Sequence, residues 1–404
     1  MTTVREHRRR IAILGSGNWG TAIAKLIGEN VQGKPADYEN EIKLWVHQEL
    51  IDGKNLTDII NTERENVKYL PGIKLPSCII ADDDLISCAR QADILIVCIP
   101  HIFLPKVLEK LKTAKEGVLK ETTIAISLTK GIFFNKVHGP ELVSAMIKNK
   151  LSLNHVAVLM GANVASDVAR GDFVEATLAC DTLDEKSVDY SLLKNLFQRE
   201  SFQVEFASDV ASVELFGALK NVIALGAGFC DGMSLGASTK AAVIRKGLYE
   251  MNLFCKTFSS YFEDDVVLKS CGVADLIATS FGGRNKLCAA EFARRFIQKI
   301  DTRGELSWIE IEQELLGGQH LQGLSTCDEV VALLRWLENP LNTSVIGESS
   351  NIANADESPH MIKTSLLSVV KSSSQLPKFP LIRQIHAIAR DGADPRSLFQ
   401  SWLN

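Results

Sequence analysis

Short segments that are apolar at every position set the strongest limit on how this chain can fold. The clearest is residues 94–99, whose sequence ILIVCI leaves no polar face to turn toward water. Strands of this kind belong in a parallel sheet that helices cover on both faces. Eight strand candidates, separated by amphipathic stretches, fill the first half of the chain: residues 10–14, 42–46, 78–81, 94–99, 123–127, 156–160, 176–180 and 203–207. The pattern predicts an α/β, doubly wound domain.

The second half of the chain changes character near residue 208, where the strand candidates stop. We therefore expect two domains, residues 1–207 and an all-α domain over residues 208–404. Within the second, residues 339–374 are rich in Ser and Asn, which is typical of a surface insertion. Apolar residues at helical spacing predict the helices of this domain: residues 210–227, 239–262, 286–300 and 326–337, with an amphipathic segment over 379–403.

Charge and cysteine usage exclude several classes of partner. The chain has 44 Lys+Arg against 49 Asp+Glu, a formal net charge of −5, so nothing draws it generally to nucleic acid or to acidic lipid. Its nine cysteines form no CxxC pair, which argues against a disulfide framework or a metal site and fits a reducing compartment. No segment reaches the ~18 apolar residues of a membrane span. We expect no nucleic-acid partner, no membrane and no metal, and the basic first ten residues leave a targeting role open.

A glycine-rich loop directly follows the first expected strand and precedes an expected helix, residues 21–27. Gly15 allows a tight turn, Gly17 lets the backbone approach a pyrophosphate, and Gly20 allows the helix to pack closely on the strand. A bare GxGxxG motif can be a structural turn, but a strand before it and a helix after it indicate a dinucleotide-binding, Rossmann-type domain. Six loop residues are therefore candidate cofactor contacts: Gly15, Ser16, Gly17, Asn18, Trp19 and Gly20.

The dinucleotide pattern is incomplete at its acidic position. The second expected strand comes late, after a polar loop over residues 30–41, and is followed by His47 instead of the acid that usually binds the ribose 2′-hydroxyl. Glu49 lies two residues further on. The local pattern alone leaves NAD and NADP as open alternatives.

Seven blocks of sequence, taken in order, carry a resemblance to a known family. They are GSGNWGTAIAKL (15–26), VCIPHIF (97–103), SLTKG (127–131), MGANVASDVA (160–169), ELFGALKNVIALGAGFCDG (214–232), CGVADLIATSFGGRNK (271–286) and GQHLQG (318–323). The chain resembles the cytosolic, eukaryotic type of NAD-dependent glycerol-3-phosphate dehydrogenase. The resemblance implies a cytoplasmic homodimer that uses NAD to interconvert dihydroxyacetone phosphate and sn-glycerol 3-phosphate. Such a reaction would link glycolysis to the supply of glycerolipid precursors and to NADH reoxidation.

The resemblance also implies which residues do the chemistry. Lys220 would be the general acid/base, which requires burial or a nearby cation to lower the pKa of its amino group. Lys130, which follows an expected strand, resembles the family's second active-site lysine. Asp275 resembles a catalytic residue of the family that orients the lysine corresponding to Lys220. From the residues alone, Lys220 would instead be expected at a helix edge, with its amino group in water, and Asp275 at a helix start.

The remaining site residues follow from the same resemblance. A Gly-Gly-Arg-Asn turn before a helix can hold a phosphate, since Arg forms paired bonds and a helix start attracts anions. His320 stands where the family has a lysine, so no cofactor contact is assigned to it. By the same resemblance, His47 falls where the family often has an aromatic residue at the adenine side, and it is a weak candidate for a cofactor contact. The implied substrate contacts are Lys130, Asn163, Thr279, Arg284 and Asn285, and the further cofactor contacts are Phe103, Lys130, Ala165, Arg284 and Gln322.

Two other function classes share parts of this pattern. A β-hydroxyacid or 6-phosphogluconate-type dehydrogenase also joins a Rossmann domain to a helical domain with a catalytic Lys–Asn pair, but GGRN and GQxLQG argue against it. A non-catalytic NAD(H)-binding regulator could have the same fold. The presence of Lys130, Lys220, Asp275 and Arg284 argues against that alternative.

Overall fold

The computed structural model describes residues 8–114, 117–135, 139–180, 188–259, 262–298, 305–338 and 378–402. The predicted insertion over residues 339–374 lies outside these, as does most of the basic N-terminal segment. Contacts divide the chain into two compact units. The first comprises Met1–Lys130 and Val143–Val210, and the second comprises Gly131–Leu142 and Ala211–Asn404.

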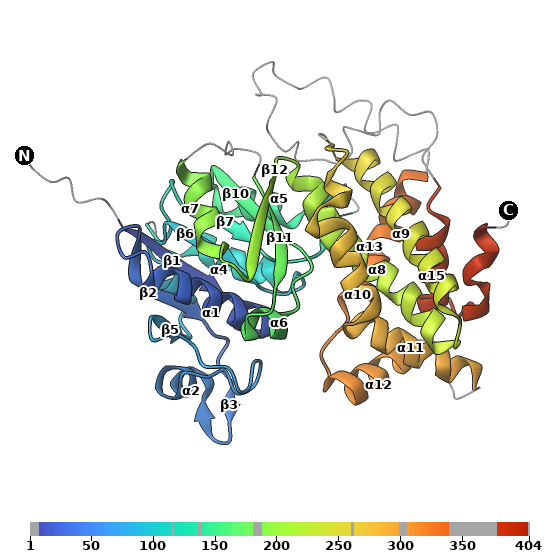
Figure 1. Ribbon diagram of the computed structural model, residues 1–404, viewed down its shortest axis with the longest axis horizontal. Helices are drawn as coiled ribbons and strands as arrows, with labels where there is room; N and C mark the ends of the chain where they lie inside the picture. Colours follow the sequence, from blue (N-terminus) through green and yellow to red (C-terminus); the bar gives the residue numbers. More distant parts are fainter. Residues whose placement is uncertain are drawn as a thin grey trace, which may run out of the picture. The chain divides into compact units, whose positions relative to one another are not determined.

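The first unit is built on an eight-stranded sheet with the order β12-β11-β10-β7-β6-β1-β2-β5 (Figure 1). Each of its strands corresponds to one of the eight predicted from the sequence. Their side chains are largely buried and form the core of this unit. The strands are β1 Arg9–Leu14, β2 Tyr38–Trp45, β5 Ile79–Asp82, β6 Ile94–Val97, β7 Ile124–Ser127, β10 His155–Met160, β11 Val174–Ala179 and β12 Phe202–Ala207.

One pair of neighbours departs from the predicted parallel arrangement, because β10 and β11 are antiparallel. The helix between them, α6 (Ala165–Arg170), has six residues and ends at Gly171, which is left-handed with φ 82°. Six helical residues rise only about 9 Å, whereas a strand of six residues is about 20 Å long. The connection is too short to return the chain to the starting end of β10, so β11 runs back beside it.

Helices cover the sheet in two packed groups. α1 packs against α6 and α7, and α4 packs against α5. The expected polar loop over residues 30–41 is shorter than predicted, because α1 continues to Gln32 and β2 starts at the buried Tyr38. The elements around the sheet are α1 Asn18–Gln32, β3 Leu50–Ile51, β4 Lys54–Asn55, α2 Leu56–Glu63, α3 Leu85–Ala89, α4 Leu104–Thr113, α5 Val143–Leu151 and α7 Val188–Phe197.

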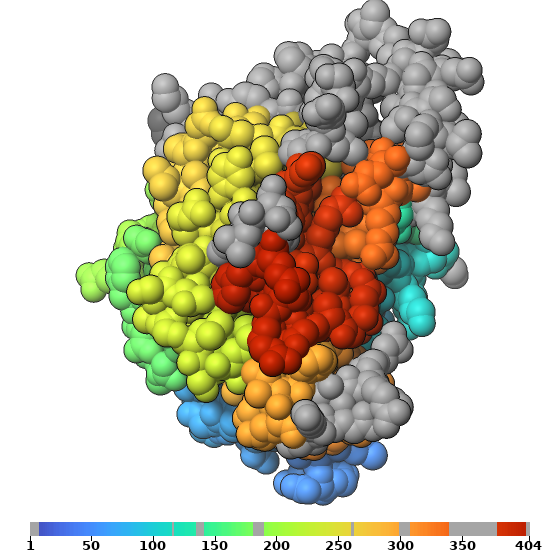
Figure 2. All heavy atoms as spheres, turned by 90° about the vertical axis from the view of Figure 1, so that its right-hand side faces the viewer, coloured from blue at the N-terminus to red at the C-terminus, as the bar shows by residue number. Residues whose placement is uncertain are grey.

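The second unit is mainly helical, as predicted, with one small hairpin that the sequence did not indicate. The hairpin joins β8 (Ile132–Asn135) to β9 (Gly139–Leu142) and contacts α13. The helical elements are α8 Val210–Gly232, α9 Ala237–Phe258, η1 Val266–Leu268, η2 Ser270–Ala274, α10 Asp275–Phe281, α11 Arg284–Ile297, α12 Glu305–Leu316, α13 Gln322–Glu338, α15 Pro380–Arg390 and η6 Pro395–Trp402. In Figure 2 the C-terminal elements, in red, lie between α9 and α13.

Helix α8 is the central element of this unit. By length and composition it could cross a membrane, but its apolar window is wholly buried among the other helices. Two glycines let α11 approach it closely: a Cβ at Gly228 would lie 2.4 Å from the carbonyl oxygen of Lys286, and one at Gly232 would lie 2.1 Å from that of Ala290. This contact holds α11, whose first residues are Arg284 and Asn285, against the C-terminal part of α8.

Candidate active site

The glycine-rich loop has the shape that a dinucleotide requires. Gly15 is left-handed with φ 112°, and a Cβ there would lie 2.3 Å from the carbonyl oxygen of Cys98. A Cβ at Gly20 would lie 2.0 Å from the carbonyl oxygen of Gly15, whereas a Cβ at Gly17 would meet no atom within 4 Å. Gly15 and Gly20 therefore keep the turn compact, and Gly17 leaves its backbone open. Because α1 starts directly afterwards, at Asn18 and Trp19, a bound pyrophosphate would face a helix N-terminus.

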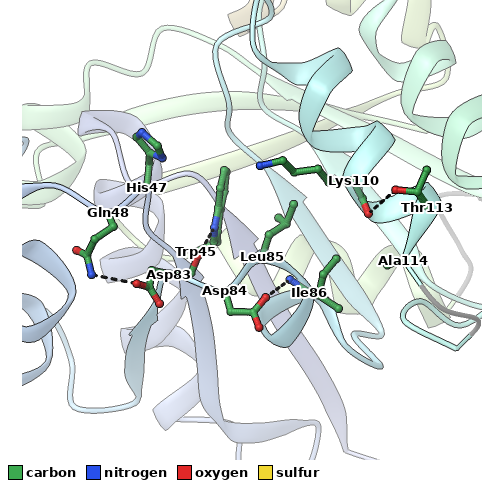
Figure 3. Close-up of a pocket in the computed structure, with 10 residues that line it drawn as sticks. All are labelled: Trp45, His47, Gln48, Asp83, Asp84, Leu85, Ile86, Lys110, Thr113 and Ala114. Atoms are coloured by element: carbon green, nitrogen blue, oxygen red, sulfur yellow. Dashed lines mark hydrogen bonds between the residues drawn. The ribbon is translucent and has the colours of Figure 1, made fainter.

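A pocket of about 540 Å³ lies at the end of β2 (Figure 3). The backbone N–H of Gly15 donates to the carbonyl of Trp45 at 3.3 Å, which links the loop to the pocket wall. This is the side of a doubly wound sheet where the adenosine half of a dinucleotide lies. The lining residues are Trp45 at the end of β2 with His47 and Gln48 after it, Asp83 and Asp84 after β5, Leu85 and Ile86 at the start of α3, and Lys110, Thr113 and Ala114 at the end of α4.

The pocket presents hydrogen-bond acceptors that sequence reasoning missed. The Nε2 of Gln48 donates to Asp83 Oδ2 at 3.0 Å and to Thr57 Oγ1 at 2.9 Å. The Oε1 of Gln48 is buried and has no hydrogen-bond partner within the described part of the chain. The carboxylates of Asp83 and Asp84, which also line the pocket, suit hydroxyl or amino donors, as on a ribose or an adenine, better than a phosphate. No motif marks Gln48 or Asp83, so only the fold reveals them.

The other predicted contacts of the first unit lie after neighbouring strands. Phe103 follows β6 and is 53% exposed, Lys130 follows β7, and Asn163 and Ala165 follow β10. Because β6, β7 and β10 are parallel neighbours, their carboxyl ends share one edge of the sheet with the glycine-rich loop (Figure 1). The Asn163 Nδ2 donates to the carbonyl of Glu175 at 2.7 Å, which fixes that side chain.

Cys98 packs beneath the glycine-rich loop, since its Cβ would lie 3.6 Å from a Cβ added to Gly20. The positive charge of Lys130 lowers the pKa of the Cys98 thiol. Burial raises the pKa of the Cys98 thiol to about 12, and Lys130 offsets this only in part. Cys98 is therefore a protonated packing residue beneath the loop.

In the second unit the structure brings three predicted residues together. Lys220, in the middle of α8, is 7% exposed and forms an ion pair with Asp275, which is 2% exposed. Its Nζ also donates to Thr279 Oγ1 at 2.5 Å. Asp275 and Thr279 lie one turn apart on α10, so both face α8. A lysine whose amino group reached water at a helix edge would not have this burial or these partners.

Asn285 connects three helices of the same unit. Its Nδ2 donates to Asn221 Oδ1 at 2.9 Å, and its Oδ1 accepts from the backbone N–H of Gly323 at 3.0 Å. The amide is thereby committed to α8 and to the start of α13, next to Gln322. Arg284, the first residue of α11, is exposed and donates from Nη1 to Gln319 Oε1 at 2.8 Å.

His320, which replaces the family lysine, is held by a buried acid. Its Nδ1 lies 2.9 Å from Glu312 Oε2, and Glu312 Oε1 accepts from the backbone N–H of Leu321 at 2.9 Å. Glu312 lies on α12, outside the seven blocks of resemblance, and was not predicted. Among the residues that the structure describes, no three His, Cys, Asp or Glu side chains group so as to hold a metal ion.

Both units match models of one family. Residues 10–186 match the NAD-dependent glycerol-3-phosphate dehydrogenase N-terminus, and residues 209–364 match the C-terminus of the same family. The chain belongs to the NAD-dependent glycerol-3-phosphate dehydrogenases. This membership confirms the resemblance, makes the protein an oxidoreductase with NAD as its cofactor, and decides against the 6-phosphogluconate-type and non-catalytic alternatives.

Individual relatives agree with the family assignment. The mouse (Mus musculus) cytoplasmic glycerol-3-phosphate dehydrogenase [NAD(+)] is 45% identical over 328 residues, which cover 81% of this chain and 88% of that protein. The solved glycerol-3-phosphate dehydrogenase of Saccharomyces cerevisiae superposes with a TM-score of 0.77 at 35% identity and covers 98% of this chain and 99% of its own. The Plasmodium falciparum enzyme gives a TM-score of 0.80 at 34% identity, covering 98% and 96%. The likeness therefore spans both units of this dehydrogenase.

Proposed function

We propose that this dehydrogenase interconverts dihydroxyacetone phosphate and sn-glycerol 3-phosphate with Lys220 as the general acid/base. The observation that carries the proposal is the buried contact of Lys220 with Asp275 and Thr279. A buried lysine that is held from two sides by a neighbouring helix has a fixed direction, which proton transfer to a reacting oxygen requires. We further propose Lys130 as the second lysine that meets the substrate oxygens, helped by Asn163 and Thr279.

In the proposed mechanism, NAD(H) held by the loop from Gly15 to Gly20 would supply or accept the hydride at the substrate carbon. In the direction of reduction, Lys220 donates a proton to the oxygen on which charge develops, and in oxidation it removes the hydroxyl proton. Asp275 keeps the amino group of Lys220 on the side of α8 that faces α10. Thr279 shares this task from the next turn of α10.

We propose that the start of α11 binds the substrate phosphate. Arg284 is exposed, and its guanidinium can form two parallel bonds to phosphate oxygens. The side chain of Asn285 is committed to Asn221 and Gly323, so its contribution would come through its backbone N–H at the helix N-terminus. The proposed NAD contacts are the loop from Gly15 to Gly20, Phe103, Lys130, Ala165, Arg284 and Gln322.

Replacement of Lys220 tests the proposed chemistry. Lys220→Ala should lower kcat by ~10²–10⁴, the usual contribution of general acid/base catalysis, while NADH still binds with wild-type affinity. Steady-state NADH oxidation with dihydroxyacetone phosphate and fluorescence titration with NADH would measure the two effects. Lys240→Met is the matched control, because Lys240 is also a buried, ion-paired lysine, bound to Asp231 on α8. A Lys220→Ala enzyme that is folded and keeps a tenth of its activity would rule Lys220 out as the proton donor.

We also propose that the enzyme is a cytoplasmic homodimer whose product feeds glycerolipid synthesis while NADH is reoxidised. The relatives named cytoplasmic and the family resemblance support this proposal. Light scattering of the purified enzyme should give a mass twice the 44.4 kDa of the chain. A monomeric mass at micromolar concentration would contradict the dimer and leave the proposed chemistry untouched.

A further inference from the structure

A buried asparagine far from every recognised motif holds the glycine-rich loop. Asn66 follows α2 and is fully buried. Its Nδ2 donates to the carbonyl oxygen of Ser16 at 2.9 Å and to Thr21 Oγ1 at 2.9 Å. Thr21 Oγ1 in turn donates to the same Ser16 carbonyl at 2.9 Å. The three side-chain bonds form a closed triangle behind the loop.

The orientation of the Asn66 amide is fixed by its other end. Its Oδ1 accepts from the backbone N–H of Tyr69 at 3.1 Å, and its backbone carbonyl accepts from Leu70 N at 2.9 Å. The oxygen is thus occupied inside its own turn, and only the NH₂ group can face Ser16 and Thr21. The turn is itself anchored, since the N–H of Leu75 donates to the carbonyl of Arg64 at 2.7 Å.

This arrangement determines the direction of one peptide group in the loop. A carbonyl oxygen has two acceptor positions, and Thr21 and Asn66 together provide two donors to Ser16. In a trans peptide the C=O and the following N–H point in opposite directions. The N–H of Gly17 must therefore point away from Asn66, and no atom lies within 4 Å of a Cβ placed at Gly17.

We propose that Asn66 is a positioning residue for the cofactor, which keeps the Gly17 N–H directed toward the NAD pyrophosphate. In the free loop, rotation of the Ser16–Gly17 peptide would turn a carbonyl oxygen toward the phosphates instead. Such a carbonyl would repel an anion, whereas the N–H attracts it. The inference rests on the NAD dependence of the family and is independent of the proton-transfer role of Lys220.

A pair of asparagines allows a matched experiment. Asn61 lies on α2, and its side-chain amide, like that of Asn66, both accepts from and donates to main-chain atoms: it accepts from Ala81 N at 2.8 Å and donates to Ala81 O at 2.9 Å. Asn66→Ala and Asn61→Ala therefore each remove the main-chain bonds of one side-chain amide, but only the first of these amides touches the glycine-rich loop. The measurements are the Kd of NADH by fluorescence, kcat, the KM of each substrate, and Tm for the full-length enzyme.

If the proposal is right, both asparagine variants lose stability, but only Asn66→Ala also loses affinity for NADH. Asn66→Ala should raise the Kd and KM of NADH about 10-fold, the size expected for losing neutral hydrogen bonds that preorganise a site. Its kcat at saturating NADH and its KM for dihydroxyacetone phosphate should stay within about twofold of wild type. Asn61→Ala should lower Tm by a similar amount and leave the Kd of NADH unchanged. Equal Kd values for wild type and a folded Asn66→Ala enzyme would overturn the proposal, as would an equal rise in Kd for Asn61→Ala.

Thr21 provides a second probe in case Asn66→Ala does not fold. Thr21→Val removes the other donor to Ser16 and keeps the shape of the side chain, whereas Thr21→Ser keeps the hydroxyl. Thr21→Val should weaken NADH binding, whereas Thr21→Ser should bind NADH with wild-type affinity. In the double variant the two effects should be less than additive, because both residues act on one carbonyl. Wild-type NADH affinity in Thr21→Val, or full additivity with Asn66→Ala, would contradict a shared role.

Discussion

At the scale of single residues, Arg284 offers the clearest test of substrate recognition. The substrate differs from dihydroxyacetone only by its phosphate, and Arg284 presents a guanidinium at the start of α11. Arg284→Ala should lower kcat/KM for the phosphorylated ketone by two to three orders of magnitude, about what two charge-assisted bonds provide. The loss with unphosphorylated dihydroxyacetone should be much smaller. Arg284→Lys should recover only part of the efficiency, because an ammonium lacks the paired geometry.

The comparison of two ketones separates phosphate binding from other roles of Arg284. In the structure Arg284 donates to Gln319, so its replacement also removes that contact. Gln319→Ala is therefore the control, and it should affect both ketones alike if Gln319 only steadies the loop before α13. Equal losses on the two ketones for Arg284→Ala would mean that the residue serves the cofactor or the fold.

The sequence points to those proposed site residues that belong to contiguous motifs, but not to residues that meet the proposed site across the fold. Lys220, Asp275 and Thr279 lie in blocks whose order and spacing are recognisable, and the structure places them in contact. Asn66 and Gln48 lie in loops with no motif. Their roles depend on side-chain amides that meet segments distant in sequence, and no local pattern encodes such a meeting.

At the scale of elements, the start of α15 depends on an acid from another helix. Glu250, on α9, is fully buried, and its two carboxylate oxygens accept from the backbone N–H groups of Leu381 at 2.9 Å and Ile382 at 3.0 Å. Glu250→Gln should destabilise the enzyme by about 1–2 kcal/mol, because one acceptor becomes a donor facing an N–H. Urea unfolding measures the effect. The control is Glu338→Gln, which removes an ion pair between Glu338 on α13 and Arg383 on α15. It should lower the free energy of unfolding by less than about 1 kcal/mol.

Acid sensitivity should arise where α13 meets α15. Burial alone would raise the pKa of Asp328, but hydrogen bonds from His386 and Arg390 lower it below its usual value. A lowered pKa in the folded state contributes stability that is complete above the unfolded pKa of about 3.9 and is lost as the pH falls through the folded pKa. Asp328→Asn should cost about 1 kcal/mol at pH 7, a modest value because Asp328 is 41% exposed.

The same variant has a predicted pH profile. The stability difference between wild type and Asp328→Asn should be present at pH 5 and shrink below pH 4, since protonation removes the charge from the wild type as well. Urea unfolding midpoints across this range measure it. A difference that grew as the pH fell below 4 would contradict the assignment of Asp328 as the stabilising carboxylate.

Strand positions were easier to predict than strand directions. Apolar runs located all eight strands of the sheet, because burial on both faces leaves a strong local signal. The antiparallel pairing of β10 and β11 depends on the length of the connection through α6, which apolar patterning does not report. The hairpin of β8 and β9 was missed because it is short and belongs to the helical unit, although it precedes β10 in sequence.

At the scale of the whole molecule, residues 339–374 are the longer of two segments outside the seven blocks of resemblance and their surroundings, the other being residues 30–41, although the match to the family's C-terminal model extends to residue 364. Residues 339–374 follow α13, and the chain resumes in the structure at residue 378, just before α15. The two flanking helices contact each other directly, since Arg383 Nη2 donates to Glu338 Oε1 at 2.5 Å and Arg390 binds Asp328. The packing of α13 on α15 therefore does not require the intervening segment as a spacer.

This geometry predicts that residues 339–374 are dispensable for turnover. A Gly/Ser linker of about eight residues can join helix ends that are already in contact, and shortening the loop about fourfold lowers its closure entropy by an amount worth ~1 kcal/mol. The shortened enzyme should keep kcat and both KM values within about twofold of the full-length enzyme, with equal or slightly higher Tm. The control is a variant of unchanged length in which the segment is replaced by a scrambled sequence of the same composition, which separates the effect of length from that of sequence. A shortened enzyme that unfolds normally but turns over at least tenfold more slowly would show that the segment contributes to the active site.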